Sequence, residues 1–155
     1  MSKSVISMSV DITDFSKQLK KLGSAVRNQT LLNAVEAGGR VIQAQAMINA
    51  NEVFSDKATG ALANSIIVET EGNGTKVSAN VGPTVIYGRI HELGGIIKAV
   101  SAKYLHFVID GVDVFTKTVH IPARPYLRPA VDNNRDKIVS AIGETIKQKI
   151  NEALR

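Results

Sequence analysis

The sequence predicts a single α+β domain in which two antiparallel β-hairpins form a sheet packed by two N-terminal helices and a long C-terminal helix. Two turn dipeptides, Asn73-Gly74 and Asp110-Gly111, each lie between segments of alternating apolar residues, as expected for hairpins. Apolar residues recur at helical spacing towards both ends of the chain. No repeat, low-complexity tract or linker divides residues 1–155, so we expect one domain.

The N-terminal third predicts a short strand followed by two helices. Alternating residues indicate the strand, and apolar residues at helical spacing indicate the helices. The strand contains Ile6, Met8 and Val10; the first helix contains Phe15, Leu19, Leu22 and Val26; the second follows Thr30 and contains Leu31, Leu32, Val35, Ile42 and Ala46. Gly38 and Gly39 interrupt the second helix. Because a mid-helix glycine costs about 1 kcal/mol relative to alanine, we expect close packing or a bend there.

Both hairpins have a register that the sequence itself suggests. Pairing Gly72 with Thr75 in the first hairpin places one set of small and apolar side chains on a common face, and puts Glu71 opposite Lys76. That face contains Ile66, Val68, Thr70, Val77, Ala79 and Val81. Pairing Ile109 with Val112 in the second hairpin also places six side chains on one face. They are Leu105, Phe107, Ile109, Val112, Val114 and Thr116. We therefore expect each hairpin to have one buried face.

The segments around the second hairpin predict a helix, a loop and a further helix. Residues 86–93 can form a short helix that Gly94-Gly95 ends, and Thr59-Gly60 should lie in an earlier loop. Small residues follow from 96 to 102, so we expect a mobile loop within residues 94–103. Near the C-terminus, the long helix is indicated by isoleucines at every fourth position, namely Ile138, Ile142, Ile146 and Ile150.

Residues 121–130 form a proline-arginine strap. Three of the four prolines in the chain, Pro122, Pro125 and Pro129, fall within eight residues. Since proline fixes φ and lacks an N–H group, this stretch should run extended, and Pro129 suits the first turn of a following helix. Arg124 and Arg128 would project from this stiff segment, and we expect their planar groups of donors to hold it through contacts with carboxylates or backbone carbonyls. The strap is therefore suited to pin two elements or two subunits.

Composition restricts the classes of function. The chain has no cysteine, which excludes disulfides and thiolate zinc sites and suggests an intracellular folding environment. Neither a signal peptide nor a membrane-spanning run is evident, so we expect no membrane partner. The net charge of +5 favours polyanionic surroundings without marking a dedicated nucleic-acid binder. Lys98 and Lys103 are candidate phosphate contacts, and a solvated basic face is the alternative.

No pattern of catalytic or cofactor-binding residues stands out. His91-Glu92 lacks the second histidine of a zinc-protease helix, because position 95 is glycine. His106 and His120 are expected on opposite faces of paired strands, away from His91. The glycines do not have the spacing of phosphate-binding loops, and no serine lies in a nucleophile elbow. We expect a non-enzymatic protein with no catalytic, cofactor or metal site.

Several short motifs occur in a distinctive order. They are Thr59-Gly60-Ala61-Leu62 with Ser65-Ile66, then Val81-Gly82-Pro83, then Tyr87 with His91-Glu92-Leu93-Gly94-Gly95, and finally IPARPYLRPA at residues 121–130. In this order, over roughly residues 10–150, the chain resembles the HK-ninety-seven gene-product-ten-like neck and tail-completion proteins of tailed bacteriophages. It is also similar to the virion-morphogenesis tail-completion proteins of contractile-tailed phages.

The resemblance implies a structural virion protein at the head-proximal end of the tail, where it would act in tail completion, as a tail terminator or in the neck, and allow head-tail joining. It implies other neck and tail proteins as partners, a hexameric homo-oligomer ring, transient passage of DNA, and assembly in the host cytoplasm. The residues that it marks as structural are Tyr87, His91, Glu92, Gly94, Gly95, Pro122, Arg124, Pro125, Leu127, Arg128 and Pro129. A phage-associated nucleic-acid-binding protein is the alternative.

Overall fold

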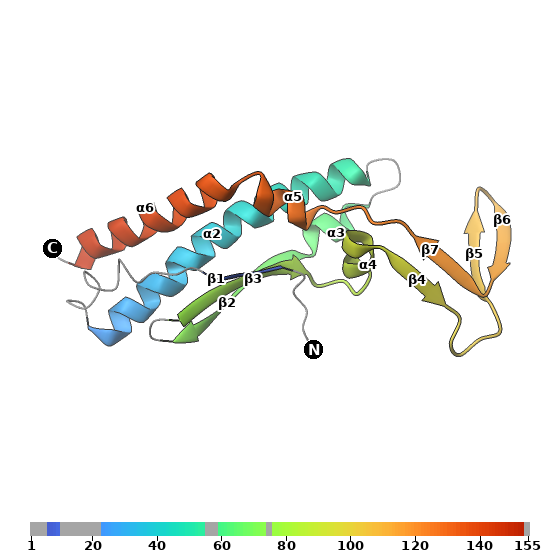
Figure 1. Ribbon diagram of the computed structural model, residues 1–155, viewed down its shortest axis with the longest axis horizontal. Coiled ribbons are helices and arrows are strands. Elements are labelled where there is room, and N and C mark those ends of the chain that lie inside the picture. The colour runs from blue at the N-terminus through green and yellow to red at the C-terminus, as the bar shows by residue number, and fades with distance from the viewer. Residues whose placement is uncertain (1–5, 10–22, 55–58, 74–75, 154–155) are drawn as a thin grey trace.

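The computed structural model describes residues 6–9, 23–54, 59–73 and 76–153, and it confirms the α+β class (Figure 1). The N-terminal half contains β1 (Ile6–Ser9), α2 (Ser24–Val53), α3 (Ala61–Asn64), β2 (Ile66–Asn73) and β3 (Lys76–Pro83). The C-terminal half contains α4 (Gly88–Leu93), β4 (Gly95–Lys98), β5 (Leu105–Ile109), β6 (Val112–Thr116), β7 (Thr118–Ile121), α5 (Leu127–Asp132) and α6 (Arg135–Ala153).

Three layers make up the body of the protein. Figure 1 shows α2 between a sheet of order β1-β3-β2 and the C-terminal helix α6. Two sides of α2 are therefore covered, and its buried residues pack against both neighbours. The main core joins Ala34, Ile42, Ala46 and Ala50 of α2 to Ile66 and Val81 of the sheet, to Tyr126, Leu127 and Ala130 near α5, and to Ile138, Ile142 and Ile146 of α6. The predicted isoleucine stripe of α6 is thus confirmed, with Ile150 partly buried.

Helix α2 begins earlier than the sequence predicts. It starts at Ser24, before Thr30, so Val26 belongs to this helix and is 47% exposed there. Leu31, Val35 and Ala46 are buried as expected. The remaining residues of the predicted first helix, 15–22, lie outside the described residues.

Gly39 allows α2 to approach the sheet closely. The helix continues through both glycines without interruption. A Cβ atom on Gly39 would lie 2.6 Å from Cγ1 of Val68 and 3.4 Å from Cβ of Ala79. The expectation of close packing at this point is therefore confirmed, and it explains why the helix tolerates a residue of low helix propensity.

The first hairpin has the predicted faces but a different register. Gly72 pairs with Val77 and Asn73 with Lys76, an offset of two residues from the expected pairing of Gly72 with Thr75. A two-residue offset leaves every side chain on its expected face, because strand side chains alternate with period two. Glu71 is consequently opposite Ser78, not Lys76. Its Oε1 accepts a hydrogen bond of 3.0 Å from Nδ2 of Asn80.

Strand β1 confirms the predicted N-terminal strand between residues 6 and 9. It pairs antiparallel with β3, with Ile6 opposite Val81 and Met8 opposite Ala79. The partners of Ile6 and Met8 in β3 are both buried. Val10 lies outside the described residues.

The second hairpin has the predicted register but does not join the first. Ile109 pairs with Val112, and the turn residues Asp110 and Gly111 have φ angles of 49° and 84°, as a primed turn requires. However, β5 and β6 form a separate two-stranded sheet, so the expectation of one sheet built from both hairpins was wrong. The expected buried face was also wrong, since no residue of this hairpin is buried.

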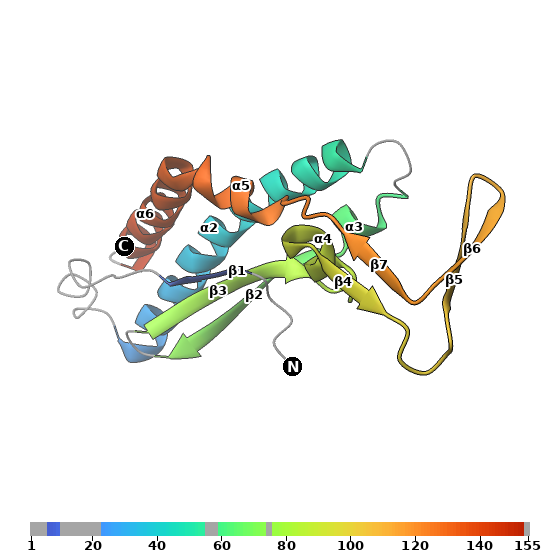
Figure 2. The same ribbon diagram turned by 45° about the vertical axis from the view of Figure 1, so that its right-hand side comes forward.

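Residues 95–121 form an arm that extends from the body. β4 pairs antiparallel with β7 as a two-stranded sheet, and the β5-β6 hairpin lies at its far end, as Figures 1 and 2 show. The predicted loop at 96–102 is therefore corrected, because Ile96, Ile97 and Lys98 belong to β4. A bond from the N–H of Ala99 to the carbonyl of Lys117 continues the pairing. Whether residues 94–103 are mobile stays a prediction.

Within the described part of the chain, no helix has the length and apolar character needed to cross a membrane.

The glycine in α2 gives a stability prediction. Gly39→Leu should destabilise the protein by about 1–3 kcal/mol, because the new side chain overlaps Val68 and forces α2 away from the sheet. Gly143 in α6 is the matched control, since a Cβ atom there meets nothing within 4 Å. Gly143→Ala should stabilise by up to about 1 kcal/mol through helix propensity. Urea denaturation measures both; a neutral Gly39→Leu would contradict the close approach.

Candidate functional site

Residues 87–95 and 121–130, the two most distinctive segments of the sequence, contact each other in the structure. The N–H of Arg124 in the strap donates a 2.7 Å hydrogen bond to the carbonyl of His91 in α4. Next to this contact, Gly95 at the start of β4 pairs with Ile121 at the end of β7. We call residues 87–95 and 121–130 together the clamp. It joins the base of the arm to the body.

Glu92 is the central residue of the clamp. Its side chain comes from α4, and the residue is only 5% exposed. Oε2 accepts hydrogen bonds from the backbone N–H groups of Tyr126 (2.7 Å) and Leu127 (2.8 Å), and Oε1 accepts one from Arg128 (2.9 Å). These are N–H groups at the start of α5, which have no partner within that helix. The carboxylate therefore caps a helix that is more than thirty residues away in sequence.

Tyr126 extends this network to α2. The residue is fully buried, and its hydroxyl donates a 3.2 Å hydrogen bond to the carbonyl of Gly88. Nδ2 of Asn49 in α2 donates a 2.9 Å bond to the Tyr126 carbonyl. Burial and, to a smaller extent, the charge of Glu92 raise the pKa of the Tyr126 phenol. A Cβ atom on Gly88 would overlap Cγ of Pro83, so a larger residue there would displace α4.

Gly94 ends α4 as the sequence predicts. It has a φ angle of 70°, and its N–H donates a 2.8 Å bond to the carbonyl of Ile90. A Cβ atom on it would lie 2.8 Å from the backbone nitrogen of Ala123, which places the strap directly against this turn. Gly95 does not share this role, because it is the first residue of β4.

The prolines of the strap behave as expected. Residues 122–125 form no helix or strand, and Pro129 lies in the first turn of α5. Leu127, the first residue of that helix, is fully buried in the main core. The strap therefore connects the exposed arm to a helix that is anchored in the body.

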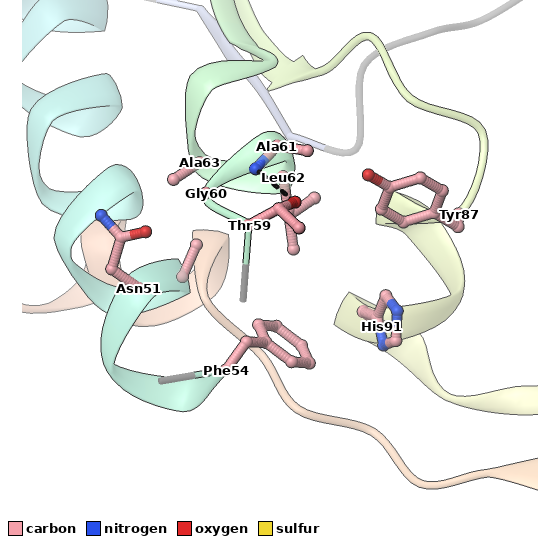
Figure 3. Close-up of a pocket in the computed structure, with 10 residues that line it drawn as sticks. Asn51, Phe54, Thr59, Gly60, Ala61, Leu62, Ala63, Tyr87 and His91 are labelled. Atoms are coloured by element: carbon pink, nitrogen blue, oxygen red, sulfur yellow. Dashed lines mark hydrogen bonds between the residues drawn. The ribbon is translucent and has the colours of Figure 1, made fainter. Parts of the chain in front are cut away.

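A hollow of about 190 Å³ lies beside the clamp, between α2, α3 and α4 (Figure 3). It is lined by Ala50, Asn51 and Phe54 of the end of α2, by Thr59, Gly60, Ala61, Leu62 and Ala63, and by Tyr87 and His91. The rings of Phe54 and His91 meet edge to face with centroids 4.7 Å apart. Burial, followed by the positive charge of Arg124, lowers the pKa of His91. The hollow is therefore largely apolar, with an uncharged imidazole at neutral pH.

The arginines do not hold the strap in the way that the sequence suggests. Arg124 and Arg128 are exposed, and among the described residues neither guanidinium forms an ion pair. Cζ of Arg124 lies 5.8 Å from the centroid of the Phe54 ring, at the hollow. Backbone hydrogen bonds and Glu92 position the strap, which leaves both arginines available to a partner.

The candidate phosphate contacts lie on the arm. Lys98 is the last residue of β4, and Lys103 lies before β5 with its Nζ 5.5 Å from the Tyr104 ring centroid. Both lysines are exposed. Their contact with phosphate stays a prediction.

The histidines are arranged differently from the expectation. His106 and His120 are not on paired strands, because β5 pairs with β6 and β7 with β4. Nε2 of His106 lies 2.6 Å from Oδ1 of Asp113, and its ring stacks on Phe115. His120 is opposite Ile96. The described residues contain no group of three metal-ligating side chains.

The Glu92 cap gives a second stability prediction. Glu92→Gln should lower the free energy of unfolding by about 1–3 kcal/mol, because an amide group cannot present two acceptor oxygens to three N–H donors. Glu69→Gln on the exposed side of β2 is the control and should change little. Thermal or urea unfolding of both variants measures the difference. Equal stability of the two variants would show that the cap contributes nothing.

Tyr126 gives a prediction about alkaline pH. Its pKa is raised in the folded protein above the 10.0 of an exposed tyrosine, so the unfolded chain loses this proton first. Stability should therefore fall as pH rises above 10, by up to about 1.4 kcal/mol per pH unit from this residue. Tyr126→Phe should remove this dependence of stability on pH, whereas Tyr104→Phe, at an exposed position, should retain it. Urea denaturation between pH 9 and 11 measures the slopes, and identical slopes in both variants would contradict the assignment.

Comparison with known protein families identifies the family of this chain. No curated protein and no solved structure gives a significant match. The family model described as "Bacteriophage HK97-gp10, putative tail-component" matches residues 13–94, more than half of the chain. The match includes α4 and the hollow and ends at Gly94, so it is shorter than the expected 10–150 and does not reach the strap. The chain belongs to this HK97-gp10-like family.

Proposed function

We propose that the chain is a non-enzymatic structural component of a tailed-phage virion, located at the head-proximal end of the tail. It completes or terminates the tail, or forms a layer of the neck, so that the tail can join the filled head. The family match over residues 13–94 carries this proposal, because that family is described as a tail component. Other neck and tail proteins are then its partners, and assembly takes place in the host cytoplasm.

The arm supports a role in assembly. Large apolar side chains are exposed along the arm and at the residue Leu93 just before it. Those on the arm are Ile96, Ile97, Val100, Tyr104, Val108, Ile109, Val112 and Phe115. A monomeric protein rarely exposes so many large apolar side chains within one segment, and exposed apolar surface of this extent marks contacts with other proteins. A subunit that is built into a larger particle has partners that cover them.

In the proposed assembly the protein forms a homo-oligomeric ring. Contacts between different surfaces of identical subunits close into a ring when the rotation between neighbours permits. The sixfold number comes from the symmetry of phage tails, and DNA would pass through the channel during delivery. Lys98 and Lys103 are the candidate residues for transient contact with its phosphates, through charge alone.

Deletion of the gene tests the proposal. We expect DNA-filled heads and separately assembled tails that fail to join, or tails with defective upper ends. Electron microscopy of lysates, with the deleted gene supplied from a plasmid as the control, distinguishes these products. Normal infectious particles without this protein would contradict a role in tail completion.

A further inference from the structure

We propose that the tip of the β5-β6 hairpin of one copy docks into the hollow between α2, α3 and α4 of a second copy. This inference rests on the ring in the proposed function and deepens it by naming the two surfaces that join neighbouring subunits. The occupant of the hollow is thus another copy of this chain.

The hairpin tip combines exposed apolar side chains with negative charge. Val112 is 64% and Ile109 50% exposed, and these two residues pair directly beside the turn. Between residues 105 and 116 the acidic residues are Asp110 in the turn and Asp113, whose Oδ1 lies 2.6 Å from Nε2 of His106. The tip can therefore present Ile109 and Val112 as an apolar projection, with the carboxylate of Asp110 at the turn beside them.

The hollow has the complementary chemistry. Its walls are largely apolar, with Phe54 and Leu62 among them, and Ile86 and Tyr87 expose further apolar surface at the start of α4. Arg124 lies at its edge, over the Phe54 ring, without an ion pair among the described residues. An apolar residue would fill the hollow while a carboxylate of the tip meets this guanidinium. Such complementarity favours one register of association.

A chain's own hairpin does not occupy its hollow. Figures 1 and 2 show the hairpin at the end of the arm, away from α3 and α4. No residue of β5 or β6 lines the hollow. The donor surface and the receptor surface are therefore separate on one subunit. Each subunit can give its hairpin to one neighbour and receive a hairpin from the other, which is the arrangement that closes a ring.

Disulfide cross-linking tests this contact directly, because the chain has no cysteine of its own. One variant carries Val112→Cys at the hairpin tip, and the other carries Ala61→Cys at the exposed edge of the hollow. The two are mixed, oxidised, and analysed as concentrated purified protein and in assembled tails. The matched control replaces Ala61→Cys by Val139→Cys, which is also an exposed site and lies on α6.

We expect a disulfide-linked heterodimer from the first pair and not from the control pair. Equal yields from both pairs, or no product in either sample, would overturn the docking contact. If tails contain the protein but give no cross-link, docking is overturned while the proposed function stands. If the purified protein cross-links specifically but is absent from tails, docking stands and the proposed function fails.

The role of Arg124 is tested with the same cysteine pair. Arg124→Glu in the receptor copy should lower the cross-linking yield about tenfold, because it places like charges at the contact. Arg124→Lys retains the charge and should keep most of the yield. Melting temperatures establish that both variants fold. An unchanged yield with Arg124→Glu would overturn the charged part of the contact.

Discussion

The buried carboxylate of Glu92 is the constraint on which the architecture depends. A buried charge is costly unless it is fully hydrogen-bonded, and here three backbone N–H groups surround it. The same bonds satisfy the start of α5, which would otherwise be buried without partners. One side chain thus fixes α4 against the strap and α5. Since the arm leaves the body at Gly95 and returns at Ile121, this contact also determines where the arm begins.

The body and the arm differ in how they are stabilised. α2, packed between the sheet and α6, supplies a continuous core, and Gly39 lets the helix lie close to Val68. The arm consists of two-stranded ribbons, which are marginal in water without packing against another surface. Its apolar residues remain exposed in a single subunit. A stable body that holds an arm in need of a partner is the physical basis for proposing assembly.

Local patterns predicted much of the fold. The isoleucines of α6, the Asp110-Gly111 turn and the proline strap depend on interactions between residues close in sequence, and each was predicted correctly. The register of the first hairpin was not, because pairings offset by two residues give the same faces and the sequence favoured Asn73-Gly74 as the turn. Strand β4 was missed because its four residues become a strand only through pairing with β7.

The site was predicted in part. Both clamp segments were singled out, but their contact was not predicted, and neither was the function of Glu92. A capping carboxylate normally precedes or begins its own helix, whereas Glu92 caps a helix contributed by a distant segment. No spacing between neighbouring residues in the sequence predicts a cap of this kind. The arginines were expected to hold the strap because their fork of donors suits buried ion pairs, yet they are exposed. The carboxylate of Glu92 and a backbone hydrogen bond from Arg124 to His91 make the contacts instead.

Amide hydrogen exchange tests the central claim, that Glu92 holds the strap on the body. The amides of Tyr126, Leu127 and Arg128 should exchange slowly in the free protein, because all three donate to one buried carboxylate. In Glu92→Gln these amides should exchange much faster, while those of Ala79 and Val81 in β3 change only by the loss of overall stability. Unchanged protection of the three strap amides in Glu92→Gln would contradict the account.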